Sequence, residues 1–393
     1  MNDVVILSAV RTPIGRFGGT LKGMTAADLG VVAARGALLA AGVKPEQVQD
    51  VEFGNGRQAG GGPNVARQIS VRAGVPVTTP AMTVNRACGS GLQAIVDIAR
   101  QIRHGEIEIG LAGGTESMSR LPFFLTGYRD GYRLGHGEVV DGMYKDGFMC
   151  PLADMVMGET AEVLAEQFGI SRQEQDEYAV ETSRRCEAAR KAGRFKDEMV
   201  AIDVPGAKGA TTRFETDEHA RDGATVEGMA KLPPVFRKTG TIHAGNSSGI
   251  TDGAAAVVLA STEAARKLRA TPLARIEAWE IAGVEPRIMG IGPVPAIRAL
   301  EIKTSTKLAV YDLVELNEAF AAQVLACDRE LKFDRARLNV NGGAIALGHP
   351  IGATGARIVA TLLHEMKRRS AKRGMATLCI SGGMGMAVSF VAP

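Results

Sequence analysis

The sequence predicts an α/β protein made of two similar βαβαβ-type halves, with a long segment inserted into the first half. Three observations predict this. Apolar runs typical of buried strands alternate with longer amphipathic runs typical of helices. The order of these runs near the N-terminus returns near the C-terminus. Between the halves, from Ser119 to Ile242, the sequence changes to loops rich in Met and Gly and to charged stretches.

The first half opens with two predicted strands, "DVVILSAVRTP" from Asp3 and "VQDVEFGNG" from Val48. The run between them, "ADLGVVAARGALLAAG", predicts a helix. A second helix, "SGLQAIVDIARQIRHG", is expected to start at Ser90 and to end at Gly105. The next run, "EIGLAGGTES" from Glu108, is expected to be a strand that leads into a Gly-Gly turn.

The second half repeats this order. "DVEFGN" in the first half corresponds to "DLVELN" from Asp312 in the second. The helix start "CGSGLQAIV" corresponds to "GHPIGATGARIV", and "GLAGGTES" corresponds to "LCISGGMG". Two pseudo-symmetric halves of this kind would bring their glycine-rich turns together at one cleft.

The inserted segment contains a predicted charged helix, "SRQEQDEYAVETSRRCEAARKAG" from Ser171, and several turn-rich loops. Long insertions of this kind often carry ligand-binding loops. The sequence becomes core-like again at "GNSSGITDGAAAVVLAS". We therefore divide the chain into a first half at 1–118, an inserted loop domain at 119–242, a return to the first half at 243–270 and a second half at 271–393.

Composition excludes several classes of protein. Of 393 residues, 45% are hydrophobic and 23% are charged, which is ordinary for a globular protein, and the net charge of +3 is spread without a basic stripe for nucleic acid. The five cysteines show no spacing typical of a zinc site or a disulfide framework, so a reducing compartment is expected. The start has no signal-peptide pattern and no apolar run reaches membrane length, which favours the cytoplasm.

Cys88 lies in "VNRACGSGLQAIV", where a helix is predicted to start. A helix N-terminus favours thiolate over thiol, and the neighbouring glycines let a ligand approach the backbone N–H groups. Cys88 is therefore either a nucleophile or, like most free cysteines, a small buried hydrophobe. His349 occupies the matching loop of the second half, where it is either a satisfied structural group or the base that activates a thiol.

Two more polar residues end predicted strands. Cys379, in "TLCISGGMG", is either a core cysteine or a second thiol that transfers a proton. Asn317, in "VELNEAFAAQ", is either a turn residue or a group that positions a water or donates to an oxyanion.

The motifs "VNRACGSG", "GNSSGITDGAAA", "NEAFAAQ", "NGGAIALGHPIGATG" and "CISGGMG", in this order, resemble the thiolase family, and most closely its acetoacetyl-CoA thiolases. The resemblance covers essentially the whole chain. It implies the five-layered α-β-α-β-α thiolase fold with an inserted loop domain that holds CoA.

The resemblance also implies a reaction. Two acyl-CoA molecules condense to a 3-ketoacyl-CoA and CoA, or the reverse thiolysis occurs, through an acyl group on Cys88. By the same resemblance, His349 polarises the Cys88 thiol and helps to form an oxyanion hole, and Cys379 removes the α-proton of the second acyl-CoA. Asn317 holds a water that stabilises the enolate oxygen. The backbone N–H groups of Cys88 and Ser381 form a second hole. No metal and no redox cofactor is expected, because the CoA thioesters are substrates.

The family pattern also suggests CoA-binding residues, which are Met157, Arg221, Phe236, Ser248, Met289, Ala319 and Phe320. Arg221 is expected near the nucleotide end of CoA, unless it is simply a solvated surface charge. The chain departs from the family pattern at three positions, with Val156 in place of His, Gly228 in place of Ser and Ser381 in place of Gly. A left-handed backbone at Ser381 would make that exchange costly. Val156 either has no functional effect or orients CoA less firmly and admits longer acyl groups.

The sequence leaves one alternative function open and argues against three others. A broader-chain 3-ketoacyl-CoA thiolase of fatty-acid degradation shares all these motifs, so the chain-length preference stays open. Cys379 and "NEAF" argue against a ketoacyl synthase, and "CGSG" lacks the Cys-aromatic pair of papain-like peptidases. The four chemical residues argue against a non-enzymatic lipid-binding relative. The expected partners are acyl-CoA, CoA and further copies of the chain, and "SRLPFFLTGYRDGYRLGHG" favours a homotetramer over a dimer.

Overall fold

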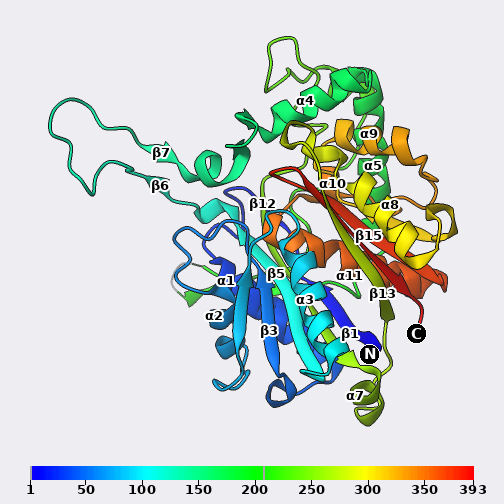
Figure 1. The fold of residues 1–393 in the computed structure, drawn as a ribbon. Helices are drawn as coiled ribbons and strands as arrows, with labels where there is room; N and C mark the ends of the chain where they lie inside the picture. The colour runs from blue at the N-terminus through cyan, green and yellow to red at the C-terminus, as the bar shows by residue number, and fades with distance from the viewer. Residues whose placement is uncertain (1, 207–208) are drawn as a thin grey trace.

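The computed structural model describes residues 2–206 and 209–393. A ten-stranded mixed sheet runs through both halves (Figure 1). Its strands are β1 (Val4–Arg11), β2 (Gly15–Arg16), β3 (Asp50–Gly54), β4 (Ala81–Val84), β5 (Ile109–Ser117), β12 (Thr251–Ser261), β13 (Ala274–Gly283), β14 (Leu313–Leu316), β15 (Arg373–Ile380) and β16 (Met384–Val391).

The order of the strands shows the two halves directly. It is β14-β15-β16-β13-β1-β12-β5-β3-β4, with β2 beside β12. From the centre outward, β13-β16-β15-β14 repeats β1-β12-β5-β3. In both halves the third and fourth strands are parallel, β5 to β3 and β15 to β14. The predicted correspondence of "DVEFGN" and "DLVELN" is confirmed, because these runs form β3 and β14.

Helices cover both faces of the sheet and also fill the space between the two halves. They are α1 (Ala26–Ala41), α2 (Val65–Arg72), α3 (Ser90–His104), α7 (Thr262–Lys267), α8 (Pro293–Thr304), α9 (Ala321–Leu331), α10 (Ala344–Leu347) and α11 (Ile351–Arg369). Short 3-10 turns lie at η1 (Pro45–Gln47), η2 (Met118–Arg120), η5 (Pro286–Ile291) and η6 (Leu308–Val310). Helix α1 begins at a Thr25 capping box and ends at Gly42, and α3 ends at Gly105 as predicted.

The core has three main layers of apolar contacts. The outer layer of the first half joins α1 and α2 to β1, β3, β5 and β12. The outer layer of the second half joins α8 and α9 to β14, β15 and β16. The central layer packs α3 and α11 between strands of both halves, through residues such as Ile95, Ile358 and Phe390. The arrangement is therefore helix, sheet, helix, sheet, helix, which confirms the five layers expected from the resemblance.

One expected turn is wrong. Gly113 and Gly114 were expected to end the strand, but both lie inside β5 and pair with β12. A Cβ on Gly113 would lie 2.6 Å from the Phe53 ring, and one on Gly114 would lie 2.0 Å from the Gly352 carbonyl oxygen. These glycines therefore permit close packing instead of a turn. The matching glycines of the second half, Gly382 and Gly383, do form a turn, each with φ of 89°.

The inserted segment leaves the sheet after β5 and returns at β12, which lies beside β5. It contains β6 (Phe123–Phe124), β7 (Val140–Asp141), η3 (Tyr144–Phe148), β8 (Met149–Cys150), β9 (Met155–Val156), α4 (Met157–Gln167), α5 (Arg172–Lys191), β10 (Ile202–Pro205), β11 (Thr211–Phe214) and α6 (Val226–Ala230). The predicted charged helix is α5, which Ser171 caps. The boundaries at 118, 242 and 270 stay predictions.

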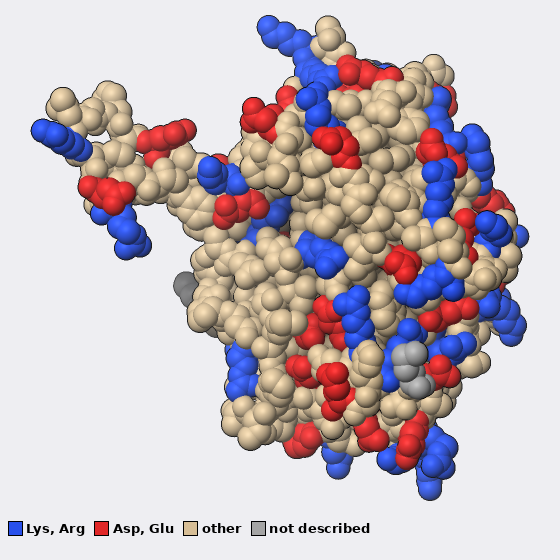
Figure 2. Space-filling model, in the orientation of Figure 1, with Lys and Arg blue, Asp and Glu red and all other residues tan. Residues whose placement is uncertain are grey.

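The surface carries one prominent feature. Strands β6 and β7 form the base of an arm that projects from the body (Figures 1 and 2). On the face shown in Figure 2, basic and acidic side chains are interspersed, in agreement with the charge pattern of the sequence. Among the described residues, no helix is both long enough and apolar enough to cross a membrane.

The first turns of α3 and α11 touch each other, as the repeat predicted. A Cβ on Gly91 of α3 would lie 2.8 Å from the Gly352 carbonyl oxygen and 3.0 Å from the Ala356 nitrogen of α11. A Cβ on Gly355 would lie 2.2 Å from the Leu92 nitrogen. The two helix starts therefore meet backbone to backbone.

Gly355→Ala should destabilise the protein, because the added methyl group meets rigid backbone. We expect a loss of about 1–3 kcal/mol in the free energy of unfolding, typical of overpacked cores, despite the better helix propensity of alanine. Urea unfolding followed by circular dichroism measures it. Gly23→Ala is the matched control, because nothing lies within 4 Å of its Cβ position. Equal stability of the two variants would contradict the close contact.

Candidate active site

Cys88 lies between β4 and α3, directly before Gly89, the N-cap of α3. The preceding residue, Ala87, has a φ of 45°, so the chain turns sharply there. Cys88 is partly exposed. Desolvation by the surrounding protein raises the pKa of its thiol, while the backbone N–H groups of Ser381 and of Cys88 itself, and the charge of Arg57, act to lower that pKa.

Cys379 comes to the same place from the end of β15. It is buried, and burial raises the pKa of its thiol well above the usual value, with a further contribution from the charge of Cys88. The Cβ position of Gly89, next to Cys88, lies 2.7 Å from the side chain of Ile380, next to Cys379, so the structure brings the two cysteine segments together. Ser381 follows, but the left-handed backbone falls on Gly382 and Gly383 and not on Ser381. Serine is therefore accommodated there without left-handed strain, and its N–H still points at the Cys88 sulfur.

His349 lies in the loop between α10 and α11, and its N–H donates to the Gly249 carbonyl at 3.0 Å. Its Nδ1 lies 2.6 Å from the Thr354 hydroxyl oxygen, which itself lies 3.1 Å from the Pro350 carbonyl. With Thr354 donating to that carbonyl, Nδ1–H donates to Thr354 and Nε2 is left as an acceptor. Nε2 is buried and has no hydrogen-bond partner among the described residues. Burial, followed by the charges of Arg357 and Arg57, lowers the pKa of His349 to about 3, so the ring is neutral at physiological pH.

Asn317 directly follows β14 and is fully buried. Its N–H donates to the Thr377 carbonyl at 2.9 Å, two residues before Cys379. Within the described part of the chain, neither its side-chain oxygen nor its side-chain nitrogen has a hydrogen-bond partner. Buried polar atoms are almost always paired, so such an amide is suited to bind a ligand or a water.

An apolar wall adjoins Cys379. Five of the seven residues suggested for CoA binding lie in the same apolar cluster as Cys379. These five residues form the apolar wall and are Met157, Phe236, Met289, Ala319 and Phe320. The rings of Phe236 and Phe320 meet edge to face with centroids 6.4 Å apart. Ser248 is tied to this wall, because its N–H donates to the Ala319 carbonyl at 3.0 Å.

The remaining positions singled out in the sequence lie outside this wall. Arg221 is exposed on a loop of the inserted segment, and its charge lowers the pKa of His219. Val156 is partly buried at the start of α4, where its N–H donates to Glu159 at 2.9 Å. Gly228 is exposed in α6, and its N–H donates to the Thr225 hydroxyl at 3.1 Å.

Sequence reasoning missed three residues that support the site. Thr354 contacts His349, and its signal is its place five residues later in the same motif. Glu116, buried at the end of β5, accepts the N–H groups of Gly56 at 3.0 Å, Arg57 at 3.1 Å and Gly352 at 2.8 Å. Nothing in the pattern around Arg57 indicated that this arginine is buried.

The groups at this site are those needed for nucleophilic catalysis and proton transfer. It offers one partly exposed thiol, one buried thiol, a neutral imidazole with a free nitrogen, and donors directed at one sulfur. These groups suit a nucleophile that attacks a carbonyl carbon, a proton acceptor and an anion-stabilising pocket.

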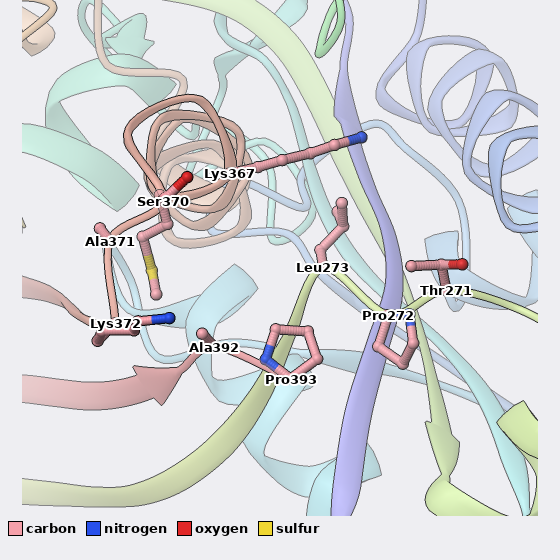
Figure 3. A pocket seen from close by; sticks show the side chains of 10 residues that line it. Thr271, Pro272, Leu273, Lys367, Ser370, Ala371, Lys372, Ala392 and Pro393 are labelled. Carbon is pink, nitrogen blue, oxygen red and sulfur yellow. The ribbon is translucent and has the colours of Figure 1, made fainter.

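A hollow of about 270 Å³ lies at the C-terminal end of α11, away from His349 (Figure 3). Lys367, Ser370, Lys372 and Pro393 line it, together with residues before β13. Helix α11 has 19 residues. At 1.5 Å per residue it separates this hollow from His349 by roughly 28 Å. The hollow is therefore not part of the site.

Comparisons with known proteins cover the whole chain. The model of the thiolase N-terminal domain matches residues 4–263, and that of the thiolase C-terminal domain matches residues 270–392. An acetyl-CoA acetyltransferase of Cupriavidus necator is 51% identical over 389 residues, 99% of each chain. The crystal structure of the Bacillus anthracis acetyl-CoA acetyltransferase matches with a TM-score of 0.98 at 46% identity, covering 100% of this chain and 99% of that one. The human mitochondrial 3-ketoacyl-CoA thiolase in complex with CoA matches with a TM-score of 0.96 at 46% identity, covering 100% and 98%.

Limited iodoacetamide should alkylate Cys88 before the other four cysteines. Cys150, Cys186, Cys327 and Cys379 are buried, whereas Cys88 is partly exposed and has N–H donors at its sulfur. We expect a rate at least about tenfold higher at Cys88, because reactivity follows thiolate fraction and access. Peptide mass spectrometry at successive times measures it. Equal labelling of Cys88 and Cys379 would contradict the preferential accessibility of the Cys88 sulfur.

Proposed function

The chain belongs to the thiolase family and is an acyltransferase, and from this premise we propose that it condenses two molecules of acetyl-CoA to acetoacetyl-CoA and CoA, and catalyses the reverse thiolysis. One observation carries the assignment of the site. Cys88 and His349, whose Nε2 has no partner among the described residues, lie just before α3 and α11, the two helices whose first turns touch, and the segment of Cys379 adjoins that of Cys88.

The first half-reaction transfers the acetyl group to Cys88. His349 Nε2 accepts the thiol proton, and the Cys88 sulfur attacks the thioester carbonyl. The N–H groups of Cys88 and Ser381 stabilise the tetrahedral oxyanion. The C–S bond to CoA breaks, and the leaving CoA sulfur takes the proton of Cys379. Acetyl-Cys88, protonated His349, the Cys379 thiolate and free CoA result.

The second half-reaction forms the carbon–carbon bond. The Cys379 thiolate removes an α-proton from a second acetyl-CoA, and protonated His349 with a water on Asn317 stabilises the enolate oxygen. The enolate carbon attacks the acetyl carbonyl, the Cys88 sulfur leaves and His349 returns its proton. Burial suits both groups to this work, because a thiolate with a raised pKa is a strong base and an imidazolium with a lowered pKa is a strong donor.

CoA is proposed to lie along the apolar wall. Met157, Phe236, Met289 and Phe320 would contact the pantetheine arm and the acyl group, and Ser248 would contact the same arm. The human relative in complex with CoA supports CoA binding by this fold. Arg221, which is exposed, is proposed to reach the nucleotide end of CoA. The proposed reaction uses no metal and no redox cofactor.

A broader chain-length range is the second candidate. The likeness to a human 3-ketoacyl-CoA thiolase favours it, and Val156 and the adjacent methionines offer an adaptable apolar surface. Acetyl-CoA remains the preferred substrate, because the relative with 51% identity carries that activity in its name. Initial rates of thiolysis with 3-ketoacyl-CoAs of increasing length separate the two candidates.

We also propose a homotetramer in the cytoplasm. Strand β4 is an edge of the sheet, and the unpaired N–H and C=O groups of an edge strand can pair with a strand of a second copy. The arm exposes Phe123, Tyr128 and Leu134, with exposed fractions of 66%, 68% and 98%. Such a patch suits contact between dimers. A reducing compartment keeps both thiols of the mechanism free.

Incubation of the protein with acetyl-CoA and no thiol acceptor should leave one acetyl group on Cys88. The decisive variant is Cys379→Ser, which should still acetylate Cys88, more slowly because the leaving CoA loses its proton donor. The same variant should lose hydrogen–deuterium exchange at the methyl group of acetyl-CoA by at least about 100-fold, the usual contribution of a positioned base. Intact-mass and peptide mass spectrometry locate the acetyl group, and NMR follows the exchange. Acetylation at Cys379 alone, or exchange at the wild-type rate, would disprove the two-thiol mechanism.

Replacing Leu134 and Tyr128 by Asp should convert the tetramer into a dimer, because charged groups cannot be buried in an apolar contact without a partner. Light scattering at roughly micromolar concentration, where obligate oligomers stay assembled, measures the mass. Leu39→Asp, at a position 85% exposed on α1, is the control and should leave the tetramer intact. A monomeric mass for the wild-type protein would contradict the assembly.

A further inference from the structure

Arg57 is a buried cation whose guanidinium donates only to backbone carbonyls among the described residues, with no carboxylate at hydrogen-bond distance. It lies in the loop between β3 and α2 and is only 8% exposed. One terminal nitrogen donates to the Gly147 carbonyl at 2.9 Å, and the other lies 3.5 Å from the Gly56 carbonyl. In the described ranges of the chain, its Nε has no hydrogen-bond partner. Burying a charge in this way is costly, so an anion that forms next to it would be stabilised.

The loop that carries Arg57 is fixed against both halves of the active site. The Asn85 side chain donates to the Gly56 carbonyl at 3.4 Å, just ahead of the nucleophile segment. The Cβ position of Gly56 lies 3.0 Å from Ile351, two residues after His349, and 3.7 Å from the Ala87 carbonyl. Arg57 therefore belongs to the frame that holds the nucleophile and the imidazole.

Glu116 completes this frame. Its carboxylate accepts the backbone N–H groups of Gly56 and Arg57 and also that of Gly352 in α11. It is thus engaged by the backbone and makes no side-chain ion pair with Arg57 at hydrogen-bond distance in the described structure. The guanidinium charge therefore acts on two buried groups, because it lowers the pKa of Glu116 as well as that of the Cys88 thiol.

The inserted segment holds the guanidinium in place. Gly147 lies in the π-helical turn η3, and its Cβ position is 2.9 Å from Arg57 Nε. Any side chain at position 147 would therefore push against the guanidinium. The same turn ends at Phe148, which packs in the cluster that contains Cys88.

We propose that Arg57 is an electrostatic positioning residue: held by the Gly147 carbonyl, it stabilises the negative charge that forms on the Cys88 sulfur. It acts through Cys88 and needs no contact with substrate. The proposal rests on the proposed function only in taking Cys88 as the nucleophile.

The charges around Cys88 give the direction of the effect. Arg57 lowers the pKa of the Cys88 thiol against the raising effect of burial, and Glu116 raises it. Cys379 and His349 also face the site, and Arg57 lowers the pKa of His349 as well, so the imidazole stays neutral. Removing the positive charge must therefore move the titration of Cys88 to higher pH.

The pH dependence of Cys88 alkylation by iodoacetamide, without any CoA compound, tests this. Arg57→Met should raise the midpoint by about one pH unit, the usual effect of a nearby opposite charge, whereas Arg57→Lys should keep most of the wild-type value. Gly147→Ala, which displaces the guanidinium, should also raise it. Arg72→Met is the matched control, because it removes an equal charge from the exposed surface of α2. Thermal melting identifies variants that do not fold.

An unchanged midpoint in folded Arg57→Met would overturn the proposal. If that variant does not fold, an unchanged midpoint in Gly147→Ala, or a midpoint in Arg57→Lys raised by a full unit, does so instead. A shift equal to that of Arg72→Met would reveal only a general charge effect and would also overturn it. The assay does not depend on acetyl transfer: a wild-type protein that shows the expected shifts but never forms acetyl-Cys88 contradicts the proposed function and not the role of Arg57.

Discussion

The backbone contact between the first turns of α3 and α11 is the constraint on which the site depends. Cys88 precedes one helix and His349 precedes the other, so the distance between these helix starts sets the distance between thiol and imidazole. Gly91 and Gly355 leave no side chain between them. Glu116 adds a polar tie, because it accepts an N–H from the start of α11 as well as from the loop after β3. Glycine at this contact is therefore a requirement of the chemistry as well as of packing.

Burial then sets the electrostatics of the site. It raises the pKa values of Cys88 and Cys379 and lowers that of His349, so every group is held in its neutral form. Charges arise only during the reaction, when preorganised N–H donors and the guanidinium of Arg57 are already in position. A low-dielectric site with fixed donors stabilises such charges more than water that must reorient.

The inserted segment is held to the body by buried ion pairs. Arg11 of β1 donates to Glu198 at 2.6 Å and to Asp217 at 2.7 Å, and all three side chains are buried. Within the inserted segment itself, Glu162 of α4 accepts the backbone N–H groups of Thr241 and Ile242, each at 2.9 Å. Buried pairs of this kind contribute precise geometry more than stability. The Glu162 contacts hold Ile242, which belongs to the same apolar cluster as Cys379.

The sequence by itself determined the alternation of strands and helices, the two-fold repeat and the identity of the chemical groups, because periodicity, glycine turns and motif order are local properties. Its local signals also placed the ends of α3 and the existence of the charged helix α5. It misassigned Gly113 and Gly114, because the difference between a turn and a close contact depends on Phe53 and Gly352, which lie far away in the chain. Only the tertiary structure decided that Ser381 avoids left-handed backbone, that Thr354 holds His349, and that Arg57 is buried beside the nucleophile. Each of these depends on which distant backbone groups surround the residue, and burial and hydrogen-bond partners are set by the packing of the two halves and the insertion together.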